Sequence, residues 1–274
     1  MEKTGKGKNM RRKNLLNAAG AVLMALGLNA CFSFNSDSRP EAVATYVSLP
    51  VRVDGKLEEP AWHKTPAYTL VHAEEQFRRS APDVQKFFRN GVVEAGKVRL
   101  LWDDKYLYAG FEFTDSDIVA EGLTDQLHHY RFGDVAELFL KPENKSWYWE
   151  LYVTPSGRKT AFFFPGRGLL GLPSGFSEKI ALNGMIAAAS FKGTLNNSWD
   201  KDKKWTAEMA IPLSELAMAG EKLDPKVPWL IFFGRYNYGR YLMTVEHSSF
   251  PLQKTVNYHE HYYYARLKLV KGAK

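Results

Sequence analysis

The chain has 274 residues, of which 45% are hydrophobic and 14% aromatic, with 37 Lys and Arg against 30 Asp and Glu. Residues 1–30 hold six of the basic side chains and one of the acidic ones, so the rest of the chain is close to neutral and gives nucleic-acid binding no electrostatic support. The single cysteine, Cys31, excludes an intramolecular disulfide, so the fold must be stabilised by its core.

The N-terminal region has the pattern of an export signal. Residues 1–14 are basic and polar, and residues 15–30 are small and apolar, a run too short and too rich in alanine for a comfortable membrane span. Leu28-Asn29-Ala30-Cys31 resembles the lipobox at which bacterial lipoproteins are cleaved and lipidated. We therefore predict a lipoprotein signal peptide over residues 1–30, lipidation of Cys31, a tether over residues 31–45, and export to a bacterial membrane, namely the outer membrane with a periplasmic or surface face.

Strand patterns dominate the rest of the chain. Leu107, Ala109, Phe111 and Phe113 alternate with residues of the opposite face, which is the period of a half-buried strand. Further strands are expected at 98–102, 135–140, 148–153, 159–164, 185–191, 205–211, 229–236 and 263–270. Helical signals are limited to one turn near 57–62 and a short helix from Pro212. Many strands without βα alternation predict one all-β domain over 46–271, an antiparallel β-sandwich with few short helices.

Four segments carry a resemblance to a known family. They are VDGKLEEPAW (53–62), LWDDKYLY (101–108), DVAELFL (134–140) and WTAEMAIP (205–212). Their order and spacing resemble the family 9 carbohydrate-binding modules and their relatives in the DOMON-like superfamily, whose sandwiches are of jelly-roll or immunoglobulin-like type. The resemblance implies a β-sandwich that binds a glycan without cleaving it.

Sugar recognition requires aromatic rings for the C–H face of a pyranose and polar groups for its hydroxyls. Aromatic residues cluster at 147–152, 236–241 and 258–264. Strand alternation places Glu137 opposite to the apolar side chains of its strand, and Tyr152 opposite to those of the next strand. If these two strands pair, Glu137 and Tyr152 share one non-core face.

The resemblance assigns roles to several residues. Glu137 corresponds to the family acid that hydrogen-bonds the ligand, and Tyr152 lies near a polar ligand-binding position of the next strand. Arg235 corresponds to an Arg of a later strand. Tyr258 corresponds to a stacking aromatic residue, and His259 to the His that follows it.

One position departs from the family pattern. Sugar-binding members place a Trp three residues before the first Asp of the third segment, where this chain has Arg131 between Tyr130 and Phe132. Tyr130 and Arg131 are therefore also candidate ligand-binding residues, with Tyr130 as a second stacking ring and Arg131 stacking on a sugar or pairing with an acidic one.

Three alternatives remain open from the sequence. Glu137 and Glu150, if directly paired about 5 Å apart, would suit a retaining glycoside hydrolase. Haem-binding relatives use His and Met ligands, for which the chain offers His128, His129, Met243, His247 and His259. Asp115 and Asp117 lie at a strand end and are weak candidates for calcium, although no metal or other cofactor is required.

The favoured interpretation is a non-catalytic carbohydrate-binding lipoprotein. It would be held to its membrane by the lipid anchor and would support polysaccharide breakdown by separate glycoside hydrolases. The glycan, the membrane leaflet and the partner enzymes are left open by the sequence.

Overall fold

A computed structural model describes residues 39–79, 93–242 and 244–271. Within these residues the structure consists mainly of strands: β1 (Glu41–Tyr46), β2 (Ala67–Thr69), β3 (Gly96–Trp102), β4 (Tyr106–Thr114), β5 (Val135–Pro142), β6 (Tyr148–Val153), β7 (Lys159–Phe164), β8 (Leu172–Pro173), β9 (Ile186–Lys192), β10 (Lys204–Pro212), β11 (Trp229–Asn237), β12 (Glu246–Phe250) and β13 (Ala265–Val270). The helical segments are α1 (Pro60–Lys64), α2 (Glu74–Arg79), α4 (Leu213–Met218) and the 3₁₀ turns η1 (His129–Arg131) and η2 (His261–Tyr263).

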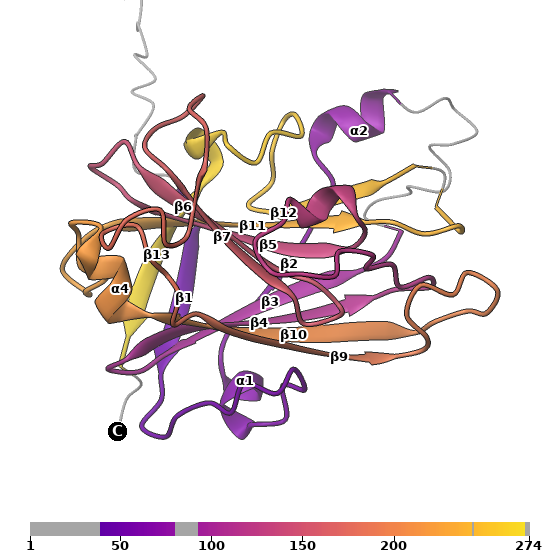
Figure 1. Ribbon diagram of the computed structural model, residues 1–274, viewed down its shortest axis with the longest axis horizontal. Helices are drawn as coiled ribbons and strands as arrows, with labels where there is room; N and C mark the ends of the chain where they lie inside the picture. The colour runs from indigo at the N-terminus through magenta and orange to yellow at the C-terminus, as the bar shows by residue number, and fades with distance from the viewer. Residues whose placement is uncertain (1–38, 80–92, 243, 272–274) are drawn as a thin grey trace, which may run out of the picture. The chain divides into compact units, whose positions relative to one another are not determined.

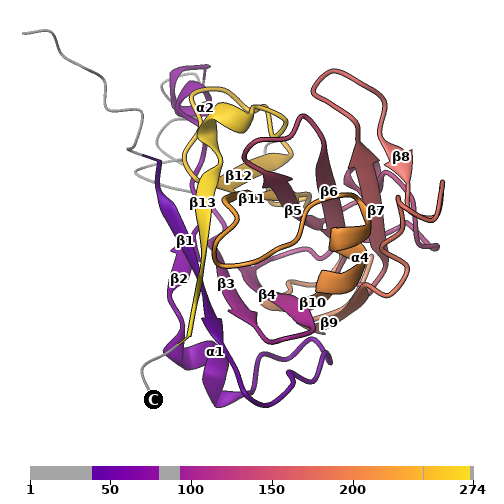
Figure 2. The same ribbon diagram turned by 90° about the vertical axis from the view of Figure 1, so that its left-hand side faces the viewer.

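The strands form one curled sheet that folds into two layers. Its order is β8-β7-β6-β5-β11-β13-β1-β3-β4-β10-β9, and nearly all neighbours are antiparallel. The exception is β1, which pairs in parallel with both β13 and β3. Figure 1 shows β5, β6, β7 and β11 in one layer above β3, β4, β9 and β10 in the other, and Figure 2 shows β1 and β13 side by side where the layers join.

Alternating side chains of both layers build the core between them. From one layer come Leu138, Trp149 and Phe233, and from the other Phe111 and Trp205, all essentially inaccessible to solvent. Each of these residues has the parity that strand alternation assigns to the buried side, so the hydrophobic pattern also decides which side chains face outward.

Two of the four segments that carry the family resemblance contact each other. Glu208 of β10 accepts hydrogen bonds from the backbone N–H groups of Asp54 (2.9 Å) and Gly55 (2.7 Å) and from Trp62 Nε1 (2.9 Å). Gly55 has φ +82°, and a Cβ there would lie 2.5 Å from the backbone of Ala189. The 53–62 segment therefore lies flat against β9 and β10 because Glu208 fixes it and Gly55 has no side chain.

The predicted sandwich is confirmed, with a mixed rather than purely antiparallel sheet. The predicted strands are found within a few residues of the expected ranges, as β3, β4, β5, β6, β7, β9, β10, β11 and β13. Residues 41–45 belong to β1 and not to a tether, because their backbone groups pair with both neighbouring strands. Short or polar elements, namely β2, β8, β12 and α2, were not predicted.

The predicted signal peptide and Cys31 lie outside the described residues. Among the helices that the structure describes, none has the length and apolar content needed to cross a membrane.

Candidate functional site

The outward side of β5, β6, β7 and β11 carries most of the predicted ligand-binding residues. We call this surface the aromatic face. Its rings are contributed by the four strands, by the η1 loop and by the segment 251–264, which lies over this layer (yellow in Figure 1). Its members are Tyr130, Phe139, Tyr148, Tyr152, Phe162, Phe164, Phe232, Tyr236, Tyr258 and Tyr264.

Glu137 lies at the centre of the aromatic face. On β6 its direct cross-strand neighbour is Tyr152, as the strand pattern predicts, and on β11 it is Gly234. The side chain is 1% exposed, and its Oε1 has no hydrogen-bond partner among the described residues. Burial, together with the nearby Glu150 carboxyl, raises the pKa of Glu137 well above its ordinary value. The neutral form of this acid can both donate and accept a hydrogen bond.

A second buried acid, Glu150, lies diagonally across from Glu137. It is opposite Phe139 in the β5–β6 register and two residues from Tyr152, whose hydroxyl donates to Glu150 Oε1 at 2.7 Å. Burial raises the pKa of Glu150 to about 7. His259 Nε2 is 3.9 Å from the same oxygen, and His259 Nδ1 is 2.8 Å from the hydroxyl of Tyr148.

The two acids are not the direct cross-strand pair on which the sequence-based hydrolase hypothesis rests. They lie on adjacent strands and on one face, as expected. Their diagonal placement, however, corresponds to Cα atoms roughly 7–8 Å apart, whereas directly opposed residues approach to about 5 Å. The requirement of direct opposition is therefore not met.

Three tyrosine rings line the approach to Glu137. The ring centroids of Tyr130 and Tyr236 are 5.4 Å apart, and those of Tyr236 and Tyr258 are 5.6 Å apart. Tyr130 is also 6.3 Å from Tyr152. Tyr130 and Tyr236 are half-buried, and Tyr236 lies close enough to the carboxyl of Glu137 for the two groups to interact electrostatically.

Tyr258 joins this group but is not a surface ring. It is 5% exposed, and its hydroxyl lies within hydrogen-bond distance of the carbonyl oxygens of Arg235 (3.0 Å) and Ser248 (2.9 Å). Its ring packs on Gly234, where a Cβ would lie 2.4 Å from a ring carbon. The structure thus gives Tyr258 a packing role beneath the site, and Tyr130 and Tyr236 present the accessible rings.

Arg235 is not part of the aromatic face. It pairs with Ala136 on β5, so it points to the side opposite to Glu137. Its guanidinium is fully buried, 3.0 Å from Asp115 Oδ2 and 2.7 Å from Asn237 Oδ1, with its Cζ 4.5 Å from the Phe113 ring centroid. The assignment of Arg235 as a ligand-binding residue is therefore wrong for geometric reasons.

Arg131 lies at the edge of the aromatic face. It is exposed, and its guanidinium carbon is 5.5 Å from the ring centroid of Tyr130. Of the seven residues predicted to bind ligand, the structure brings together Glu137, Tyr152, Tyr258, Tyr130 and His259, with Arg131 beside Tyr130.

The acids of the sequence motifs fall into two groups. Asp103 accepts hydrogen bonds from the backbone of Lys105 and the hydroxyl of Tyr108, and Asp134 ties the backbones of Val119 and Tyr238. Glu208 holds the 53–62 segment in the same way. Glu137 alone among these four has a buried oxygen without a partner in the described residues. A buried acceptor without a partner is costly, which marks Glu137 as the motif acid available to a ligand.

The calcium candidates are engaged by protein groups, apart from Asp117 Oδ1, which has no hydrogen-bond partner among the described residues. Asp115 accepts from Trp205 Nε1 and Arg235, and Asp117 Oδ2 accepts from Ser198 and the backbone of Arg240. Within the described ranges, no group of three or more His, Cys, Asp and Glu side chains is arranged to hold a metal ion.

The histidines considered as haem ligands are dispersed. His128 is exposed and stacks on Phe162, whereas His129 is buried at the start of η1. His128 precedes and His129 begins the 3₁₀ turn η1, so neither lies on a strand. His247 is half-buried against Tyr236, and Met243 lies outside the described residues.

Sequence reasoning missed Tyr236 as a site residue. A signal was present: Ile231 and Phe233 are core residues, so alternation places Gly234 and Tyr236 on the other face of β11. The family resemblance pointed instead to Arg235, which the same alternation places on the core side of β11.

Comparison with known proteins identifies the fold. The structure is similar to that of a candidate carbohydrate-binding protein from Bacteroides uniformis, with a TM-score of 0.62, 13% sequence identity, and coverage of 85% of this chain and 100% of that one. It is also similar to a family 9 carbohydrate-binding module from Caldicellulosiruptor kristjanssonii, in complex with cellotriose (TM-score 0.52, 14% identity, 85% of this chain and 95% of that one) and with glucose (0.53, 14%, 85% and 97%). No family model and no curated protein matches the sequence. The fold is therefore that of the family 9 modules.

Proposed function

We propose that this protein binds carbohydrate at the aromatic face. The observation that carries the proposal is the buried Oε1 of Glu137, which has no hydrogen-bond partner among the described residues and lies near Tyr236, whose ring contacts that of Tyr130. In this function the two rings cover the apolar face of a sugar, and Glu137 hydrogen-bonds a hydroxyl group. The fold supports the proposal, since similar structures were solved with glucose and cellotriose bound.

The sharpest test separates binding from stability at Glu137. Replacing Glu137 with Leu removes the hydrogen-bonding group and also the cost of burying it. We expect Glu137→Leu to leave the unfolding free energy unchanged or higher, while binding of glucose and cellotriose falls by roughly tenfold or more. Calorimetric titration and urea unfolding of the full chain measure the two effects, with the exposed Glu178→Leu as control. Unaltered binding by the Leu variant would remove Glu137 from the site.

Glycoside hydrolysis is a second candidate, favoured by the presence of two buried acids with raised pKa on one face. The similarity to structures solved with sugar bound makes binding the better supported function. Release of reducing sugar from cellotriose by the wild-type chain, abolished in Glu150→Gln, would reverse that order.

We further propose that the protein is exported and anchored through a lipid on Cys31, and that it supports polysaccharide breakdown by separate glycoside hydrolases. The supports are the sequence pattern of residues 1–31 and the proposed sugar binding. Incorporation of radiolabelled palmitate into the wild-type protein but not into Cys31→Ser tests the anchor. Retention of Cys31→Ser in the membrane fraction would contradict it.

A further inference from the structure

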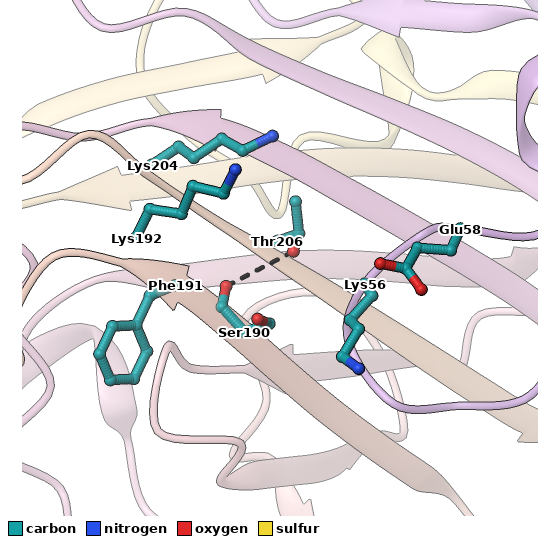
Figure 3. Close-up of a pocket in the computed structure, with 7 residues that line it drawn as sticks. All are labelled: Lys56, Glu58, Ser190, Phe191, Lys192, Lys204 and Thr206. Atoms are coloured by element: carbon teal, nitrogen blue, oxygen red, sulfur yellow. Dashed lines mark hydrogen bonds between the residues drawn. The ribbon is translucent and has the colours of Figure 1, made fainter.

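The outer side of the second layer contains a polar cavity remote from the aromatic face. The cavity has a volume of about 350 Å³ and is lined by Lys56, Glu58, Ser190, Phe191, Lys192, Lys204 and Thr206. Figure 3 shows the side chains of Lys192 and Lys204 side by side, with Lys56 and Glu58 across from them and Thr206 between. These residues come from β9, β10 and the 53–62 segment that Glu208 holds in place.

The lining carries three lysines against one glutamate. Lys192 and Lys204 are direct cross-strand partners in the β9–β10 register, and like charges in that position destabilise a sheet. Lys204 Nζ has an acid partner, Glu112 Oε1, at 3.5 Å. The ammonium groups of Lys56 and Lys192 have no ion-pair or hydrogen-bond partner among the described residues, and both side chains are exposed.

The positive charge extends over the neighbouring strands. Lys97 and Arg99 of β3 share this outer side. Among the described residues, two strand acids lie beside them: Glu112, which is shared between Arg99 (3.5 Å) and Lys204, and Glu208, which holds the 53–62 segment. We call the surface formed by Lys56, Lys97, Arg99, Lys192 and Lys204 the basic face. Its excess of cations is complementary to a ligand that carries several negative charges.

The cavity is larger than one small anion needs. Its volume corresponds to roughly ten water molecules, at about 30 Å³ each. Besides the cations it presents the hydroxyl of Ser190 and the carboxylate of Glu58, which suit the hydroxyls of a sugar. All three of its cations are lysines, which act as point charges and fit a tetrahedral oxyanion without the planar, two-bond geometry that Arg offers a carboxylate.

From these observations we propose a second binding site, in which the cavity holds a sulfated sugar unit of an anionic polysaccharide. The sulfate lies between Lys192 and Lys204, and the sugar ring extends toward Lys56 and Glu58. The site lies on the opposite layer from Glu137 and does not depend on sugar binding there, so either proposal can fail without the other.

Affinity electrophoresis of the full chain in gels containing dextran sulfate, with neutral dextran as the matched matrix, tests the proposal. We expect retardation by dextran sulfate only, weakening steeply with salt. The double variant Lys192→Gln with Lys204→Gln should bind roughly tenfold more weakly, because two exposed ion pairs contribute together about one tenfold step in affinity. Lys226→Gln, at an exposed lysine outside the cavity, and Glu137→Leu should bind as the wild type does.

Several results would overturn the proposal. These are equal retardation by neutral dextran, no retardation at low salt, or an equal loss in Lys226→Gln, which would indicate a non-specific effect of net charge. Stronger binding to vesicles containing phosphatidylglycerol, or to duplex DNA, with the same dependence on Lys192 and Lys204 would assign the basic face to a membrane or to a nucleic acid instead. Because both lysines are at the surface, circular dichroism should show an unchanged fold in every variant.

Discussion

The aromatic face and the basic face are the outer sides of two layers of one sandwich, and they hold their polar groups in opposite ways. On the aromatic face the segment 251–264 and η1 cover the strands, so Glu137 and Glu150 are buried and their pKa values are raised. On the basic face Lys56, Lys97 and Lys192 are exposed and Lys204 is half-buried. Water screens the repulsion between Lys192 and Lys204, and Glu112 partly neutralises Lys204.

Because the two faces differ in burial, a polar group without a partner has a different meaning on each of them. A buried carboxyl without a partner lowers stability, so its presence is itself a sign of use. An exposed lysine without a partner costs little, so the basic face draws its argument from the cavity and from the excess of cations around it. The five predictions below address this contrast, beginning with the largest effect.

Truncation of Tyr258 should damage the aromatic face most. Its buried ring fills the space above Gly234, and its hydroxyl holds segment 251–264 to β11. We expect Tyr258→Ala to lower the unfolding free energy by about 4 kcal/mol, and Tyr258→Phe by about 1 kcal/mol. Urea unfolding measures both. If Tyr258→Ala instead left stability intact and abolished only glucose binding, Tyr258 would be a stacking residue after all.

Removal of Glu208 should lower the stability of the basic face, as removal of Tyr258 lowers that of the aromatic face. Glu208→Ala leaves three donors, in Asp54, Gly55 and Trp62, without their acceptor. We expect a loss of about 3 kcal/mol in unfolding free energy, with a smaller loss for Glu208→Gln, which keeps one acceptor oxygen. Dextran sulfate binding should fall because the wall formed by Lys56 moves, whereas glucose binding should persist. Loss of glucose binding at full folding would show that the two faces are coupled.

The pH dependence of stability should come from the aromatic face. The pKa of Glu150 is about 7 in the folded protein against an ordinary 4.5, so the folded state binds the proton more tightly than the unfolded state does. This contribution is fully present below pH 4.5 and is lost as pH rises through about 7. We expect the wild type to lose about 2 kcal/mol more than Glu150→Gln between pH 5 and pH 8. Parallel pH profiles of the two proteins would refute the buried, protonated acid.

The sequence predicts some features of the two faces but not others. Alternation placed Glu137 and Tyr152 together and identified the core between the layers, because parity decides toward which side of the sheet a side chain points. Strand alternation could not show that the Tyr258 ring is buried, because its burial depends on how the segment 251–264 folds back on Gly234. Nor could alternation reveal the cavity. The cavity exists because Gly55 and Glu208, which are far apart in sequence, bring the 53–62 segment onto β9.

The accessible rings should have moderate effects on sugar binding. Tyr130 and Tyr236 are half-buried rings in contact with each other, and Tyr236 lies near Glu137, so each contributes apolar contact with a sugar ring. We expect Tyr130→Ala to weaken glucose binding about fivefold, with little change in stability. Calorimetric titration measures the change, and Tyr262→Ala, at an exposed ring outside the aromatic face, serves as control. Equal effects of the two variants would contradict a specific role for Tyr130.

The smallest effect is expected at Arg131, which stands where the family resemblance predicts a Trp. Its guanidinium lies over Tyr130 at the exposed edge of the aromatic face, a contact worth about 0.5–1 kcal/mol. Arg131→Ala should therefore change glucose affinity only about threefold. Arg131→Trp should strengthen it, because an indole offers a second apolar wall to a neutral sugar. If Arg131→Ala weakened the binding of an acidic sugar such as glucuronate far more than that of glucose, the aromatic face would also select for charge. The recognition of anionic ligands would then not be confined to the basic face.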